Sequence, residues 1–177
     1  GLGPSISPGR TIYKDIYSLR PAHYMNAYNG FKEINRYWAL ERYNHKRTYE
    51  ETVYDVRCLV NNSIKQQLLS DVPISCMLSG GLDSSIITGV ASQYVSKLAT
   101  YSVDYQDQEK YFQPYEYQTT RDDHYIEEMR LRYNTNHKTV TLSQKQLVMA
   151  LKESLIARDA PGMADIDSSF LLFSKEI

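Results

Sequence analysis

Apolar positions along the chain switch between helical and strand-like spacing, and this switching predicts most of the elements. Thr48 and Glu51 have the spacing of a capping box, and a helix pattern starts there. Asp71-Val72-Pro73 then ends the helix and leads into a strand. Between these limits, residues at intervals of three or four predict one apolar face: Val53, Val56, Val60, Ile64 and Leu68.

The chain after Pro73 alternates strands with helices. An apolar run predicts a strand at 74–78, and two further strands are predicted at 98–105 and 137–142. Helices are predicted at 84–97 and 122–133, from Ser143 to about Arg158, and at 170–177, where Ser168-Ser169 opens the last helix after a Pro161-Gly162 break. The face of the helix after Ser143 would hold Leu147, Ala150 or Leu151, and Leu155. Segment 106–121 has no clean period and is predicted to be a loop or insertion. The alternation indicates an α/β fold, with a parallel sheet covered by helices on both faces.

The first 47 residues have a different pattern. Residues 1–10 are rich in glycine and proline and predict a loop. Short strands are predicted at 22–28 and 31–38, joined by the turn Asn29-Gly30. The polar stretch 39–47 is typical of a linker. We therefore expect a small β-hairpin ahead of the α/β unit.

Composition narrows the class of protein without choosing a function. The chain has 177 residues, a net charge of −1 and 42% hydrophobic residues, so no overall charge favours nucleic acid or a membrane surface. No apolar run approaches the roughly 18 residues of a membrane span, and no signal peptide is visible. Cys58 and Cys76 are expected to be buried free thiols in a reducing cytoplasm. The 16 tyrosines are interpreted as surface and packing residues.

The stretch Ser79-Gly80-Gly81-Leu82-Asp83-Ser84-Ser85 carries the chemistry. It lies between a predicted strand and a predicted helix, where backbone N–H groups and the helix dipole favour an anion. Two glycines let a phosphate approach the backbone, and three serines add hydroxyl donors. The carboxylate of Asp83 could hold a magnesium ion beside the phosphates.

What this loop lacks narrows its chemistry further. It has no lysine, which the GxxxxGK[ST] phosphate loop requires, and it is not a GxGxxG dinucleotide loop. The sequence SGGLDSS resembles the pyrophosphatase loop of the N-type ATP pyrophosphatases. That resemblance implies cleavage of ATP between its α and β phosphates, with adenylation of a substrate.

Flanking motifs extend the resemblance to one family. Tyr37-Trp38, the long helix, Ser70-Asp71-Val72-Pro73 and the loop are similar to glutamine-dependent asparagine synthetases. The segment 19–24 resembles the LxPGHY motif of their glutaminase domain, with Ala22 in place of the usual glycine. The segment from Asp159 resembles their DEPxAD motif, with Ala160 in place of glutamate.

The resemblance implies a specific reaction. ATP and Mg²⁺ would serve to adenylate L-aspartate, ammonia from glutamine would displace AMP from β-aspartyl-AMP, and pyrophosphate would be released. The implied fold is the adenine nucleotide alpha hydrolase-like (Rossmann-like) sheet, here incomplete. The implied protein is a cytoplasmic ligase of asparagine biosynthesis with a glutamine amidotransferase domain, acting on small molecules and forming a homodimer when intact. Phosphates would bind Ser79, Gly80, Gly81, Ser84 and Ser85, Asp83 would bind the metal, and Met77, Leu78 and Val103 would line the adenine pocket.

Two departures from the family pattern shape the expected domains. Residue 1 is glycine, where the glutaminase needs a cysteine nucleophile, and no SGEGxDE loop occurs before Ile177. We therefore expect residues 1–47 to be the tail of a glutaminase domain with its linker. Residues 48–177 would form the first half of the synthetase domain. We expect this chain alone to have no glutaminase activity and little or no synthetase activity. It has no certain catalytic residue of its own.

Other readings of the sequence remain open. The enzyme could be a related carboxylate-adenylating synthetase, of the β-lactam synthetase or peptide cyclase type, and a non-catalytic nucleotide-binding module is the third reading. Five residues fall where the family binds aspartate or lines its channel, and a capped helix start explains them as well: Asp159, Asp165, Asp167, Ser168 and Ser169. His137 is expected to be structural. His124, beside Asp122 and Asp123, is expected to lie in a solvated helix start rather than a metal site.

Overall fold

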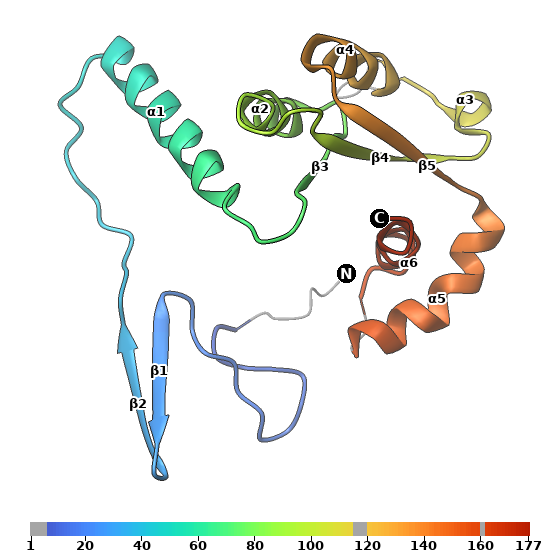
Figure 1. Ribbon diagram of the computed structural model, residues 1–177. Coiled ribbons are helices and arrows are strands. Elements are labelled where there is room, and N and C mark those ends of the chain that lie inside the picture. Colours follow the sequence, from blue (N-terminus) through green and yellow to red (C-terminus); the bar gives the residue numbers. More distant parts are fainter. Residues whose placement is uncertain (1–6, 115–119, 160–161) are drawn as a thin grey trace.

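The computed structural model describes residues 7–114, 120–159 and 162–177, with an N-terminal hairpin followed by an α/β unit (Figure 1). In the hairpin, β1 (His23–Tyr28) pairs antiparallel with β2 (Phe31–Arg36). The turn residues Asn29 and Gly30 have φ angles of 46° and 81°. Positive φ at both central residues is the requirement of a type I′ hairpin turn, so the predicted hairpin is confirmed.

Both hairpin strands are shorter than predicted. Ala22 has a φ of 59° and lies in the turn before β1, so that strand starts at His23. Tyr37 donates its backbone N–H to the carbonyl of Ala22 at 3.0 Å, but the regular ladder ends at Arg36. The predicted linker 39–47 contains no helix or strand.

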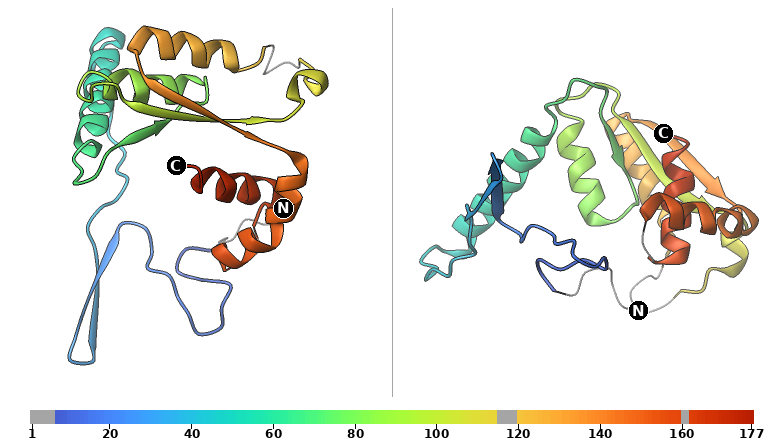
Figure 2. Two further views of the ribbon diagram at one scale, coloured as in Figure 1. Left: turned by 45° about the vertical axis from the view of Figure 1, so that its right-hand side comes forward. Right: turned by 90° about the horizontal axis from the view of Figure 1, so that it is seen from below.

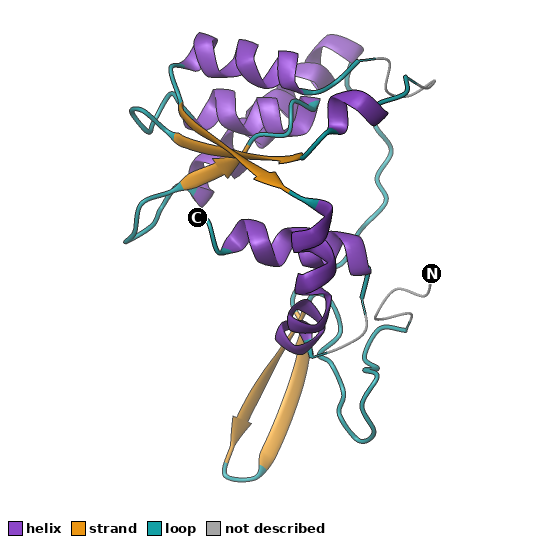
Figure 3. Cartoon of the chain, turned by 90° about the vertical axis from the view of Figure 1, so that its right-hand side faces the viewer, coloured by secondary structure: helices purple, strands orange, loops and turns teal. Residues whose placement is uncertain are grey.

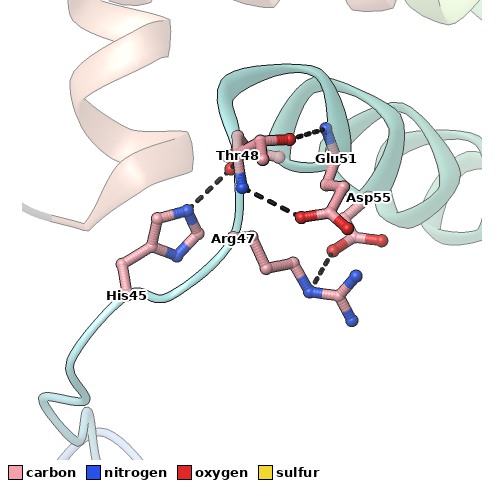
Figure 4. Close-up of polar contacts among 6 residues, drawn as sticks. His45, Arg47, Thr48, Glu51 and Asp55 are labelled. Atoms are coloured by element: carbon pink, nitrogen blue, oxygen red, sulfur yellow. Dashed lines mark hydrogen bonds and ion pairs between the residues drawn. The ribbon is translucent and has the colours of Figure 1, made fainter.

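Helix α1 (Tyr49–Gln67) begins at a complete capping box, as the sequence predicts. Thr48 Oγ1 accepts a hydrogen bond from the Glu51 N–H at 3.2 Å, and Glu51 Oε2 accepts one from the Thr48 N–H at 2.9 Å (Figure 4). An ion pair between Arg47 and Asp55, at 3.0 Å, spans the first turns of the same helix.

The predicted apolar face of α1 is only partly covered. Ile64 is buried, but Val53 and Val56 are 40% and 52% exposed. The reason is geometrical: α1 contacts α2 with its C-terminal turns, and its N-terminal turns lie away from the other helices (Figure 1). Only the C-terminal part of the apolar face of α1, next to the sheet, is therefore packed.

The sheet contains β3 (Ser75–Met77), β4 (Ala99–Tyr105) and β5 (Asn136–Leu142) in that order, all parallel. Its predicted strands are confirmed to within two residues at each end. Within the described residues, β3 pairs with β4 alone, so it forms an edge of this sheet.

Two of the predicted helices need correction. Helix α2 (Leu82–Ala91) ends six residues before the predicted Lys97, because residues 92–97 turn back to bring Leu98 into the core. Helix α6 (Ala164–Ser174) begins before Ser168, so Ser168-Ser169 lies inside the helix and does not open it. Helices α4 (Asp123–Tyr133) and α5 (Gln144–Arg158) match the predicted spans, and a short α3 (Gln108–Tyr111) occupies part of the predicted insertion. The Pro161 half of the predicted break lies outside the described residues.

Helices cover both faces of the sheet, as predicted. α2 and α4 lie on one face and α6 on the other, with α5 against α6 (Figures 1 and 3). Cys76, Ala91 and Leu98 form the core under α2. On the opposite face Phe173 of α6, which is 2% exposed, packs against Val140 and Leu142.

Helix α5 lies at the outside of the α/β unit, against α6. Of its predicted apolar face, Ala150 is buried, whereas Leu151 and Leu155 are 39% and 50% exposed. Figure 2 shows α5 beside α6 at the outside of the unit, and the half-buried Leu147 of α5 packs against the core around Phe173. Of the two residues predicted as alternatives for this apolar face, Ala150 is therefore the buried one.

The two cysteines differ in their surroundings. Both are free thiols; Cys76 is buried and Cys58 half-buried, so the expectation of two buried thiols is correct for Cys76 alone. Burial raises the pKa of the Cys76 thiol. Among the described helices, none combines the length and the apolarity that a membrane crossing requires.

Candidate functional site

The loop 79–85 joins β3 to α2 at the carboxyl end of the edge strand, as the sequence predicts. Gly80 has a φ of 81°, which favours glycine, and Gly81 is the N-cap of α2 with φ −72° and ψ 162°. Asp83 lies in the first turn of α2 and is exposed. The backbone N–H groups at this helix start are therefore available for an anion.

Ser84 stabilises the loop from inside. Its hydroxyl donates to the Gly81 carbonyl at 3.0 Å and accepts the Ser79 N–H at 3.2 Å. The two side-chain oxygens of Ser79 and Ser84 are 3.1 Å apart. These contacts fix the shape of the turn before any ligand binds, so Ser84 acts on the loop itself.

Gly80 lies directly against the start of α4. A Cβ atom on Gly80 would stand 2.7 Å from the carbonyl oxygen of Asp122 and 3.1 Å from its Cβ. The same carbonyl accepts the N–H of Ile126 at 3.0 Å, within the first turn of α4. Only glycine allows this approach, because both the space and the φ angle exclude a side chain.

A cavity of about 560 Å³ lies beside this contact. It brings together four residues of the predicted site, Met77, Leu78, Ser79 and Val103, with residues of β4, β5 and α4. This volume is in the range of small-molecule sites. The predicted adenine-pocket residues and one end of the phosphate loop therefore share one cavity.

Other predicted site residues lie outside this cavity. Gly80 and Ser85 line a second hollow of about 570 Å³ between α2 and α4. Gly81, Asp83 and Ser84 line neither, and Asp83 faces solvent from the helix start. The structure thus places the phosphate-binding and adenine-pocket candidates next to one another rather than in one enclosed volume.

A row of hydrogen-bonded polar side chains crosses β4 and β5, and Ser102, His137 and Thr139 of this row line the first cavity. Most of these residues were not predicted from the sequence. Thr100 donates to Thr135 at 3.0 Å, and the imidazole of His137 lies 3.0 Å from Thr100 Oγ1 and 3.1 Å from Ser102 Oγ. Ser102 also donates to Thr139 at 3.1 Å. Period-two hydroxyl residues in the predicted strands were the available signal.

His137 is the titratable member of this row. Burial lowers the pKa of its imidazole, and the nearby Arg130 lowers that pKa further, while Glu127 opposes both effects. Arg130 and Glu127 form a two-pronged ion pair on α4, with distances of 2.6 and 2.7 Å. The imidazole is thereby favoured in its neutral form, in which one ring nitrogen donates and the other accepts.

Arg121 lines the same cavity. Its guanidinium pairs with Glu109 of α3 at 3.2 Å and with Asp123 of α4 at 3.4 Å. The side chain is 22% exposed, whereas that of Glu109 is 83% exposed. Arg121 therefore connects the described part of segment 106–121 to the start of α4.

The segment expected to bind aspartate or line a channel makes contacts with α5 and β4. Asp167 pairs with Arg158 at 2.5 Å, and the buried Ser168 lies 3.4 Å from Ser154. The Ser169 hydroxyl is 3.0 Å from the hydroxyl of Tyr105. These contacts fix α6 against α5 and β4, and the side chain of Asp165 lies outside the described residues.

The described residues contain no cluster of three or more His, Cys, Asp or Glu side chains able to hold a metal ion. His124 is exposed beside Asp123 at the start of α4, as expected. A magnesium ion at Asp83 would therefore depend on phosphate oxygens and water for its other ligands, which suits the way Mg²⁺ binds with nucleotides.

Comparison with known proteins agrees with the motifs. The family model for asparagine synthase matches residues 55–177. Asparagine synthetase (glutamine-hydrolyzing) 3 of Bacillus subtilis strain 168 is 44% identical over 182 residues, covering 100% of this chain and 30% of that protein. The chain thus spans less than a third of this relative.

More distant relatives match part of the chain. A putative asparagine synthetase (glutamine-hydrolyzing) 2 of Methanocaldococcus jannaschii is 31% identical over 54% of this chain and 19% of its own length. Amidase chyE of Penicillium rubens is 36% identical over 47% of this chain and 13% of its own length. Since the family model covers well over half of the sequence, the chain belongs to the asparagine synthase family.

Proposed function

We propose that this chain supplies one wall of the ATP site of an enzyme that converts L-aspartate to L-asparagine. The observation that carries the proposal is the loop 79–85, a glycine turn between β3 and α2, in a chain of the asparagine synthase family. The enzyme would be a glutamine-hydrolysing ligase, with residues 48–177 contributing to its synthetase domain and residues 1–47 to the end of its glutaminase domain.

The loop residues would divide the work of binding ATP. Ser79, Gly81 and Ser85 would present backbone and hydroxyl donors to the phosphates, and Ser84 would hold the turn that presents them. Gly80 would leave the backbone accessible. Met77, Leu78 and Val103 would contact the adenine, which their position in one cavity supports.

Asp83 would hold Mg²⁺ against the phosphates. Its exposed carboxylate stands in the first turn of α2, beside the donors of the helix start. The metal ion would neutralise phosphate charge. The residues of the chain would position the α-phosphate for attack by the β-carboxylate of aspartate.

The chemical reason for adenylation is the poor reactivity of a carboxylate toward an amine. Once the β-carboxylate is bonded to the α-phosphate, AMP becomes a good leaving group and pyrophosphate is released. Ammonia from glutamine then attacks the carbonyl carbon of β-aspartyl-AMP, and AMP departs. The loop 79–85 serves the first of these two steps.

A direct test measures pyrophosphate release by the protein that carries this chain. We expect release from ATP to require L-aspartate, and Asp83→Ala to abolish it while glutamine hydrolysis continues. Asparagine synthesis by the Asp83→Ala variant would contradict the magnesium assignment. Pyrophosphate release with another carboxylic acid, but not with aspartate, would instead favour a related carboxylate-adenylating synthetase. Absence of release with every acid, together with retained ATP binding, would favour a nucleotide-binding module.

A further inference from the structure

We propose that Arg121 contacts the phosphates of bound ATP and supplies the positive charge that the loop 79–85 lacks. This inference rests on the proposed function, since it assigns a residue to the same nucleotide site. The loop itself has Asp83 as its only charged side chain. Phosphate sites normally combine backbone donors with a basic side chain, so a cation from another segment is expected nearby.

Two observations place Arg121 near the phosphate loop. Arg121 and Ser79 line the same cavity. Asp122, the next residue along the chain, lies so close to Gly80 that a Cβ there would stand 2.7 Å from the Asp122 carbonyl oxygen. The segment that carries Arg121 therefore lies beside the phosphate loop.

The guanidinium is held in place but retains donors. Its two terminal nitrogens pair with Glu109 and Asp123 at 3.2 and 3.4 Å. A guanidinium carries five N–H donors, so these two ion pairs leave others for a phosphate oxygen. Because the side chain is already ordered, it loses less conformational entropy when ATP binds.

The charges around the cavity give Arg121 a distinct role. Among the described residues that line it, Arg121 is the permanent cation, while four side chains are carboxylates: Asp104, Asp122, Asp123 and Glu127. This excess of negative charge opposes a bare polyphosphate. The structure thus favours ATP as its magnesium complex, with Arg121 as the protein's own counter-charge.

The test compares Arg121→Gln with Arg47→Gln in the protein that carries this chain. Arg47 also forms an ion pair, with Asp55, but it lies before α1 and lines neither hollow, so it serves as the matched control. Calorimetry measures the binding of Mg-ATP and of adenosine. We expect Arg121→Gln to weaken Mg-ATP binding about ten- to a hundredfold, the effect of a lost charge-assisted hydrogen bond. Adenosine binding should stay unchanged, Arg121→Lys should recover part of the loss, and Arg47→Gln should bind normally.

Each contrary outcome has a separate meaning. Mg-ATP binding unaffected by Arg121→Gln overturns the role of Arg121 and leaves the proposed function standing. An equal loss of Mg-ATP and adenosine binding also overturns it, since the residue would then support the fold of the cavity. If the unmodified protein binds no Mg-ATP, the proposed function fails, and this inference fails with it.

Discussion

The carbonyl group of Asp122 occupies the space that a Cβ on Gly80 would need, so the phosphate loop lies directly against the start of α4. Gly80→Ala should therefore cause two kinds of damage. A Cβ would clash with backbone at 2.7 Å, and a φ of 81° strains any residue with a side chain, by roughly 1–2 kcal/mol. We expect ATP binding to fall at least about tenfold, as titration of the variant with Mg-ATP would show.

Gly30→Ala is the matched control for this prediction. Gly30 has the same φ of 81°, but no atom lies within 4 Å of its added Cβ. It shares the conformational strain without the clash and lies in the hairpin, so ATP binding should remain normal. Equal binding by both alanine variants would show that the approach of Gly80 to Asp122 has no role in the site.

Ser84→Ala should loosen the loop. The substitution removes the hydrogen bonds to the Ser79 N–H and the Gly81 carbonyl, and typical losses of this kind are about 1 kcal/mol per bond. Urea unfolding should therefore show a lower stability. Ser92→Ala, at the other end of α2, is the control, because the buried Ser92 hydroxyl has no hydrogen-bond partner among the described residues. If Ser92→Ala destabilises the protein as much as Ser84→Ala does, the bracing role of Ser84 is wrong.

Phe173→Ala should be the most damaging change on the α6 face. The ring is 2% exposed and meets Tyr101 edge to face, with ring centres 6.3 Å apart. Truncating a buried phenylalanine typically costs about 3–5 kcal/mol. Phe170→Ala, on the same helix at 59% exposure, should change stability by about 0.5 kcal/mol or less. Similar unfolding midpoints for the two variants would mean that α6 does not pack on the sheet as described.

The His137 network should make stability depend on pH. Burial and Arg130 lower the pKa of His137 in the folded protein below the usual 6.5, and Glu127 only partly offsets them. Between the two pKa values the unfolded chain binds more protons, so stability falls as pH drops through about 6.5 towards the folded-state value. Below that value the contribution of His137 no longer changes with pH.

Denaturation of His137→Gln at a series of pH values would check this dependence. Removing the imidazole should flatten the stability profile between pH 7.5 and pH 5, measured by urea unfolding. His124→Gln, which removes an exposed histidine outside this network, is the control variant. An unchanged slope in His137→Gln would assign the pH dependence to other groups.

Local signals in the sequence were enough to predict most elements. The Asn29-Gly30 turn and the pairing of Thr48 with Glu51 act over a few residues, so their chemistry alone determines the hairpin and the start of α1. Tertiary packing decides what the sequence could not. Ser168 resembles a helix cap in the sequence. In the structure its side chain is buried between α5 and α6, with its hydroxyl 3.4 Å from that of Ser154, so it does not cap a helix.

The candidate site divides in the same way. The loop 79–85 was predictable because its glycines and serines are contiguous in sequence. Arg121 and His137 were not, since they reach the cavity from a segment without periodicity and from the start of a strand. Spatial neighbours that are some 40 to 60 residues from the loop leave no local trace in one sequence.

The short edge strand β3 has a consequence for the dynamics of the loop. Its three residues pair with β4. The next backbone N–H, that of Leu78, donates to the Tyr101 carbonyl at 2.7 Å. So few hydrogen bonds favour opening of this ladder, whereas the burial of Cys76 and Leu78 opposes it. The attachment of the phosphate loop therefore depends on side-chain packing more than on backbone pairing. Protection of the Leu78 amide would then report directly on how firmly the loop is held.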